Sequence, residues 1–162
     1  MQQRLSRDNG FTLVELMVVV LIIAILIAIA IPTFLGARVR AQDRAAQSNL
    51  RNALTAAKVY YADGDTSDYG FALADIEAVH ANLPFVAGNA PGAGEVGYIT
   101  LDSTGGNTDQ AVVFIAQSAS GTWFCILDEA VAPRSGTFYG EAAPPGTGAD
   151  LDTLAECDGG WN

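Results

Sequence analysis

One stretch near the amino terminus constrains this chain more than any other. Residues 16–31 (LMVVVLIIAILIAIAI) are all apolar and carry no charge. Together with its flanks, residues 11–35, the segment would form a helix about 37 Å long at a rise of 1.5 Å per residue. The hydrocarbon core of a bilayer is about 30 Å thick, so such a helix can cross it. The sequence therefore predicts a membrane-spanning helix over residues 11–35.

A single ionisable residue, Glu15, lies inside this segment. A carboxylate within a membrane helix costs roughly 2.5–3.5 kcal/mol, so its presence points to a partner and a use. The simpler interpretation is an ordinary signal-anchor helix in which Glu15 lies near the lipid headgroups.

The residues around the start of the apolar segment help to decide between a functional Glu15 and an ordinary signal-anchor helix. Residues 1–10 are short, polar and net basic, with Arg4 and Arg7 against Asp8. In a secretory signal the apolar region precedes the cleavage point, whereas a cut after Gly10 would leave it in the mature chain. Residues 10–15 (GFTLVE), followed by the apolar run, resemble the class III signal of type IV prepilins.

The resemblance continues through residues 32–34 (PTF) and 40–53, and it is strong over roughly the first 60 positions. In its details the chain looks closest to actinobacterial type IV pilins. The resemblance implies a structural subunit and not an enzyme: a pilin that polymerises into a surface filament for adhesion, motility or DNA uptake. It also implies an α+β pilin fold, in which the second half of a long N-terminal helix packs on an antiparallel sheet of about four strands.

The same resemblance implies how the chain is processed and where it acts. A prepilin peptidase would cut between Gly10 and Phe11, the new amine of Phe11 would be methylated, and Glu15 with Phe11 would act in assembly. The expected partners are other pilin subunits, the assembly platform with its ATPase, and the membrane before assembly. The leader would lie in the cytoplasm and the head outside, on a single-pass subunit that later joins an extracellular filament.

Four segments follow from the pattern along the chain: a leader (1–10), the spanning helix (11–35), its amphipathic continuation (36–62) and a head (63–162). Pro32 lacks an N–H donor and Gly36 lowers helix propensity, so the helix is expected to bend between them. Gly64 is a plausible helix stop. A 3,4 spacing predicts one apolar stripe facing the sheet, formed by Ala46, Leu50, Ala53, Leu54, Ala57 and Tyr60 or Tyr61.

The head reads as one short helix followed by strands. Apolar residues recur at helical spacing between Leu73 and Leu83, and Pro84 would close that helix. Short β-branched and aromatic runs separated by turn residues predict an antiparallel meander. The expected strands are residues 96–101, 111–116, 122–127 and 136–139.

The charge of the head indicates which partners it repels, and its two cysteines indicate the redox compartment in which it lies. From residue 62 onward there are fifteen acidic residues and one basic residue, a net charge of −14 that repels nucleic acid. Direct nucleic-acid binding is therefore not expected. Cys125 and Cys157 are far apart and lack the spacing of a metal site, which favours a disulfide in an oxidising compartment. The alternative is a pair of free buried thiols.

Acidic residues in two places invite a calcium interpretation. Residues 63–67 (DGDTS) resemble the start of an EF-hand loop, but Asp68 stands where the loop needs glycine and Ala74 where it needs glutamate. We interpret them as a solvated turn and expect no metal. A weaker possibility of calcium binding remains in the tail, where acidic residues crowd together: Asp150, Asp152, Glu156 and Asp158.

Enzymatic function finds no support in the residues. His80 is the only histidine, without a companion nucleophile or ligand, so a structural role is expected. There is no Gly-rich phosphate loop and no zinc set, and no cofactor is expected. The aromatic residues along the helix could suggest electron conduction, but packing explains them more simply.

Two other functions stay open from the sequence. A type II secretion pseudopilin would use the same helix in a short piston, and surface filaments made mainly of this chain would exclude it. A membrane-anchored binding module would keep residues 1–10 and would tolerate loss of Glu15.

Overall fold

The computed structural model describes residues 10–63, 67–142 and 146–161, apart from the side chains of residues 149 and 150. The chain forms two units, Met1–Arg38 and Val39–Asn162, which are described separately. Most of the predicted leader (1–9), the predicted helix stop Gly64 and Asp65 of the acidic turn lie outside the described residues, as does the side chain of Asp150.

A single helix, α1 (Leu13–Asp63), provides both the apolar segment and its amphipathic continuation. It remains α-helical through Pro32 and Gly36. Thr33 follows Pro32, and its hydroxyl donates a 2.9 Å hydrogen bond to the carbonyl of Ala30. That bond is an additional one beside the proline, because the carbonyl that loses its backbone donor at Pro32 is that of Ala28. The bend between Pro32 and Gly36 stays a prediction.

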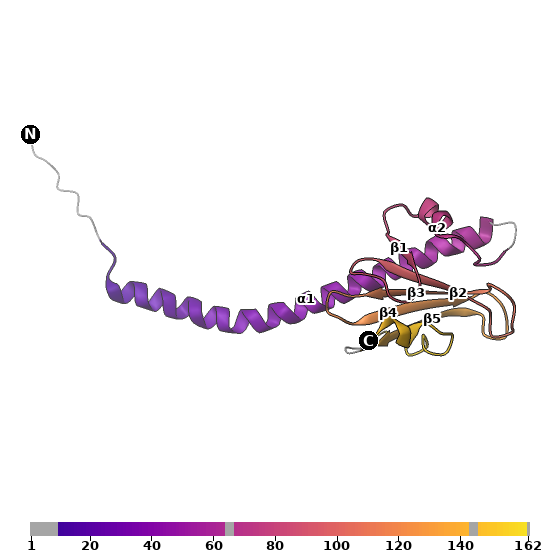
Figure 1. Ribbon diagram of the computed structural model, residues 1–162. Coiled ribbons are helices and arrows are strands. Elements are labelled where there is room, and N and C mark those ends of the chain that lie inside the picture. Colours follow the sequence, from indigo (N-terminus) through magenta and orange to yellow (C-terminus); the bar gives the residue numbers. More distant parts are fainter. Residues whose placement is uncertain (1–9, 64–66, 143–145, 162) are drawn as a thin grey trace, which may run out of the picture. The chain divides into compact units, whose positions relative to one another are not determined.

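The head contains a five-stranded sheet in the order β1-β2-β3-β4-β5 (Figure 1). All neighbouring strands are antiparallel except β1 and β2, which are parallel. The pilin-type α+β fold is therefore confirmed, with one strand more than the four expected. The elements are α2 (Leu73–Val79), β1 (Phe85–Ala87), β2 (Val96–Leu101), β3 (Ala111–Gln117), β4 (Trp123–Glu129), β5 (Gly136–Ala142) and the 3-10 helix η1 (Gly148–Leu151).

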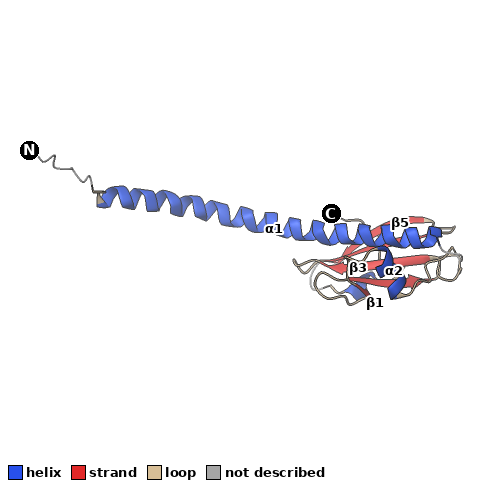
Figure 2. Ribbon diagram, turned by 90° about the horizontal axis from the view of Figure 1, so that it is seen from above, coloured by secondary structure: helices blue, strands red, loops and turns tan. Residues whose placement is uncertain are grey.

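Both faces of the sheet are covered, which explains the continuous apolar runs of β3 and β4. Val112 and Phe114 of β3 point into a core shared with α1, whereas Val113 and Ile115 point into a second core closed by the C-terminal segment. Figures 1 and 2 show α1 along one side of the sheet, and Figure 1 shows the yellow C-terminal segment on the other.

The predicted stripe on α1 is the surface that meets the sheet. Tyr60 and Tyr61 are half-buried at its end and pack against the same core. Periodicity in the sequence was sufficient here because the stripe lies within one helix. The buried residues of α1 are Ala46, Leu50, Ala53, Leu54, Ala56 and Ala57.

Helix α2 ends earlier than predicted, since the apolar spacing in the sequence indicated a helix that continues to Leu83. It ends at Val79, before His80, and only Ile76 of its residues is buried. Leu83 is also buried, but it lies in the turn that leads to β1.

A buried carboxylate, Asp128 of β4, ties the head to the helix. Its Oδ2 accepts a 2.6 Å hydrogen bond from the hydroxyl of Tyr69. Its Oδ1 accepts a 2.5 Å bond from the hydroxyl of Thr137 and lies 2.8 Å from Lys58 Nζ of α1. A buried charge is tolerated when it is paired and hydrogen-bonded. Two parts of the chain that are about 60 residues apart, one with Lys58 and Tyr69 and one with Asp128 and Thr137, therefore meet at one side chain.

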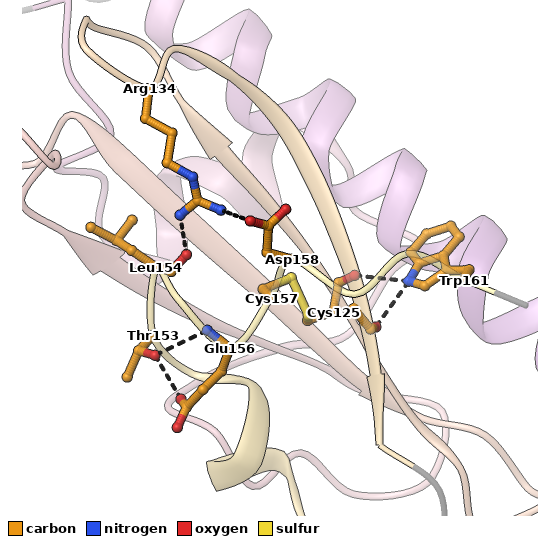
Figure 3. Close-up of a disulfide and its surroundings, with 9 residues drawn as sticks. Cys125, Arg134, Thr153, Leu154, Glu156, Cys157, Asp158 and Trp161 are labelled. Carbon is orange, nitrogen blue, oxygen red and sulfur yellow. Dashed lines mark hydrogen bonds and ion pairs between the residues drawn. A yellow bond between two sulfur atoms is a disulfide. The ribbon is translucent and has the colours of Figure 1, made fainter.

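The C-terminal segment is fastened through three side chains, those of Cys157, Trp161 and Arg134, shown in Figure 3. The predicted Cys125–Cys157 disulfide is present, with the two Cα atoms 6.0 Å apart. Trp161 donates its indole N–H to the carbonyls of Cys125 and Gly140, at 3.0 Å each. Arg134 donates to the carbonyl of Leu154 and pairs with Asp158. The segment therefore covers the sheet as part of the fold.

We expect the Tyr69 hydroxyl to make stability fall at high pH. Burial, followed by the bond to Asp128 and its charge, raises the pKa of Tyr69 well above 10.0. The unfolded chain then loses this proton near pH 10 while the folded chain keeps it, so the free energy of unfolding declines as pH rises beyond that point. Tyr69→Phe should remove up to about 1.4 kcal/mol per pH unit from this decline.

The measurement is urea unfolding in detergent between pH 8 and 11.5. Tyr60→Phe serves as the control, because the hydroxyl of Tyr60 donates no hydrogen bond to a described residue. An identical pH dependence for wild type and Tyr69→Phe would contradict the assignment.

Removing the disulfide by Cys125→Ala with Cys157→Ala should lower the free energy of unfolding by about 4 kcal/mol in the chain-entropy model. Gly140→Ala should act at the same place, since a Cβ there would lie 2.8 Å from Cys125 Sγ and 3.0 Å from the Cα of Cys157. Overpacking of this kind costs roughly 1–3 kcal/mol. Denaturant unfolding measures both, and unchanged midpoints would refute this account of the tail.

Candidate assembly surface on the N-terminal helix

The first half of α1 exposes apolar side chains on every side. From Phe11 to Leu35 each large apolar residue is between 48% and 91% exposed. Soluble monomers rarely expose an apolar patch larger than a few hundred Å². This segment therefore needs a cover that the described part of the chain does not supply, either lipid or other apolar helices.

Helix α1 is long and apolar enough to cross a membrane, by its length and composition. Among the described residues it is the one helix with these properties. The same segment can serve in lipid and in a bundle of identical helices, because lipid tails and leucine side chains are similarly apolar.

Glu15 has a partner that was not anticipated from the sequence. Its Oε2 accepts hydrogen bonds from the backbone N–H and the hydroxyl of Thr12, both at 2.8 Å. In return the Thr12 hydroxyl oxygen accepts the backbone N–H of Glu15 at 3.2 Å. This reciprocal pattern is a capping box, in which residue N3 satisfies the N-cap backbone and the N-cap side chain satisfies N3.

The capping box fixes where the helix begins and where the charge lies. α1 starts at Leu13, so Glu15 occupies its first turn, where the positive end of the helix dipole favours a carboxylate. The signal was present in the sequence as Thr12-x-x-Glu15 before an apolar run. Both hydrogen bonds from Thr12 reach Oε2, so the second oxygen, Oε1, accepts no bond from a described residue.

Phe11, the predicted first residue of the mature chain, lies just before the cap and is 91% exposed. Gly10 is also exposed, and a Cβ added to it would meet nothing within 4 Å. The predicted cleavage point is therefore free of contacts with the described part of the chain.

The described residues hold no group of three acidic, histidine or cysteine side chains placed to bind a metal ion. The tail acids instead have individual partners. Asp152 accepts a bond from Asn89, Glu156 accepts one from Thr153, and Asp158 pairs with Arg134. His80 is half-buried, and its Nδ1 has no hydrogen-bond partner among the described residues.

Comparisons with known proteins agree with this geometry. The family description "Prokaryotic N-terminal methylation motif" matches residues 5–31. The chain is 44% identical over 71 residues to the type IV major pilin protein PilA of Myxococcus xanthus (strain DK1622), covering 41% of this chain and 32% of that protein. It is 31% identical over 144 residues to fimbrial protein Q of Moraxella bovis, covering 80% and 92%. No solved structure matches the chain.

The chain thus spans about a third of the first relative and nine tenths of the second. Both matches are to proteins named as pilus or fimbrial proteins. The finer likeness to actinobacterial pilins stays a prediction.

The capping box predicts a specific effect of Thr12. Thr12→Val keeps the shape but removes the hydroxyl, and loss of an N-cap side chain costs about 0.5–2 kcal/mol. The Glu15 amide should then exchange its hydrogen roughly 2- to 30-fold faster, which corresponds to that cost. The exchange rate of the Glu15 amide can be measured by hydrogen exchange of the protein in detergent micelles. Thr12→Ser retains the hydroxyl and should match wild type, and equally slow exchange in Thr12→Val would show that the cap is unimportant.

Proposed function

Because the chain belongs to the type IV pilin family and is a structural subunit of a pilus, we propose that residues 11–35 are its polymerisation element. The supporting observation is their apolar exposure on every side, which requires a cover from outside the chain. Lipid provides this cover before assembly and the helices of other copies provide it afterwards. The subunit waits in the cytoplasmic membrane with its leader inside and its head outside, and then enters an extracellular filament.

Processing precedes assembly in this proposal. A prepilin peptidase removes residues 1–10 and the new amine of Phe11 is methylated. The exposed position of Gly10 and Phe11 supports access by the enzyme, and the methylation-motif match covers this region. The assembly platform and its ATPase then move the processed subunit from the membrane to the filament.

Glu15 then aligns the subunit in the filament. Inside a bundle of apolar helices a carboxylate is costly unless it is paired. No basic side chain lies between Arg7 and Arg38, so after cleavage the nearest cation is the amine of Phe11. The capping box supports this role, because it orients Glu15 and leaves Oε1 for the amine of the same chain or of a neighbouring one.

The first prediction concerns processing. Gly10→Arg should leave an uncleaved precursor in the membrane, since the large side chain blocks the close backbone approach that glycine allows. Gly10→Ala is the control and should still be cut. A Cβ at this position meets no other atom of the described chain, so misfolding does not account for a defect. Mass spectrometry of each variant identifies its N-terminal residue and so shows whether the chain was cut after residue 10. Normal cleavage of Gly10→Arg would contradict the proposed processing site.

The second prediction separates the charge of Glu15 from its capping role. Glu15→Gln keeps a capping-box side chain but cannot pair with an amine as an ion. It should insert, be cleaved and fold, yet form few filaments, as should Glu15→Val, while Glu15→Asp should be intermediate. Sheared filaments are quantified with each variant as the sole pilin. A normal filament yield from Glu15→Gln would assign Glu15 to helix capping alone.

A further inference from the structure

Four basic side chains form a row along one face of α1: Arg40, Arg44, Arg51 and Lys58. Their spacings of four, seven and seven residues return to nearly the same side of an α-helix, because seven residues make almost two turns. All four are exposed. We call this set the basic row.

The two members of the row that lie along the head have partners within the chain. Lys58 pairs with Asp128 at 2.8 Å, and the guanidinium of Arg51 lies 4.8 Å from the ring centre of Trp161. Arg40 and Arg44 have no hydrogen bond, ion pair or ring contact with a described residue. The nearby Asp43 instead accepts a 2.5 Å bond from Ser120. The row thus ends in two arginines that have no partner in the described part of the chain.

The opposite end of the head carries unneutralised carboxylates, which we call the acidic pole: Asp63, Asp68, Asp102 and Asp109. Asp63 is the last residue of α1. The backbone N–H of Asp109 donates to Asp102 at 3.3 Å. Oxygens of Asp68 and Asp109 lie 3.1 and 3.3 Å from the point where a Cβ on Gly70 would stand. No basic side chain of the described residues pairs with any of the four.

The two surfaces cannot neutralise each other within one chain. Arg44 and Asp63 are nineteen residues apart on one helix, which is about 28 Å at 1.5 Å per residue. The Debye length at physiological salt is about 8 Å, so the attraction between them is screened. Each surface therefore keeps its self-repulsion in the isolated subunit.

We propose that Arg40 and Arg44 of one subunit dock on the acidic pole of a second copy, displaced along the helix axis by roughly 30 Å. This contact is heterologous, since it joins two different surfaces of identical chains, and repetition of such a contact builds a helical filament. It continues along the same helix as the polymerising segment. The inference rests on the proposed polymerisation and adds a contact between heads that sets the axial offset.

Charge complementarity selects a second copy as the partner of the two arginines. The head carries a net charge of −14 from residue 62 onward, so every subunit presents an acidic surface to its neighbours. Anionic lipid headgroups near the end of the spanning segment are the competing partner. A lipid partner would need the arginines but not the acidic pole, and the test uses this difference.

The first experiment replaces the unpartnered arginines in the full chain, as the sole pilin of cells with their assembly machinery. Arg40→Gln with Arg44→Gln should reduce sheared filaments roughly tenfold or more, as expected when charge pairs at an interface are lost. The matched control, Ala45→Glu with Asn52→Glu, makes the same change in net charge at two exposed positions of the same helix. Neither position is three or four residues from a member of the basic row, so the new carboxylates do not pair with it along the helix. The control should assemble normally. A normal melting temperature of the detergent-extracted variants verifies folding.

The second experiment is a charge exchange. Arg40→Glu with Arg44→Glu should abolish filaments, and so should Asp63→Lys with Asp102→Lys. All four changes in one chain restore complementarity between copies and should restore filaments. Failure of the combined chain to assemble while its head folds would overturn the proposal in favour of a lipid or other partner.

A cross-link tests the contact directly. Arg44→Cys with Asp63→Cys in one chain cannot form an internal disulfide, because the Cα atoms of a disulfide lie within about 7 Å and these are about 28 Å apart. Oxidised filaments should therefore yield a ladder of covalent oligomers, whereas Asn52→Cys with Asp63→Cys should not, because residue 52 lies about 12 Å along the helix from Arg44. Filaments without a ladder would overturn the proposed contact alone. Absence of filaments from the wild-type chain would instead refute the proposed function.

Discussion

The central physical constraint on this protein is that one continuous helix must be covered by two different surroundings. The first part of α1 is apolar on all sides and finds no cover in its own chain, whereas the second part is apolar only along the stripe from Ala46 to Ala57. The stripe meets the sheet and the remainder of that part faces water. The first part of α1, apolar on all sides, must therefore be covered by other molecules. The second part, apolar on one side only, packs on the sheet and organises the head.

The architecture of the head also depends on burying the face of the sheet that points away from α1. A sheet with α1 on one face would leave Val113, Ile115 and Leu127 in water. The C-terminal segment covers them, although it contains little regular structure of its own. Its position depends on a disulfide, an ion pair and the doubly bonded indole of Trp161, because a short irregular segment buries too little apolar surface to hold itself in place.

Features with a local signal could be predicted from the sequence. The apolar helix, the stripe and the strands β2 to β5 all have periodicity or composition within a few adjacent residues. Strand β1 has three residues and pairs in parallel with β2, so it has no pattern to read. The partners of Asp128 could not be inferred because Tyr69 is 59 residues away in the sequence. The capping box of Thr12 and Glu15, by contrast, has a local signal, because its two side chains are three residues apart just before an apolar run.

The attachment of the head to α1 also determines how the subunit would carry mechanical load. The covalent link from the helix to the rest of the head comes only after Asp63, at the far end of the stripe. A pull on α1 at Val39, where the second unit begins, directed along the axis of α1 therefore acts as a force parallel to the line of contacts from Ala46 to Lys58. A sliding force of this kind must break many contacts together, whereas a peeling force breaks them one at a time. The Cys125–Cys157 bond closes a loop inside the head and lies off this path, so it preserves the shape of the head without bearing the pull.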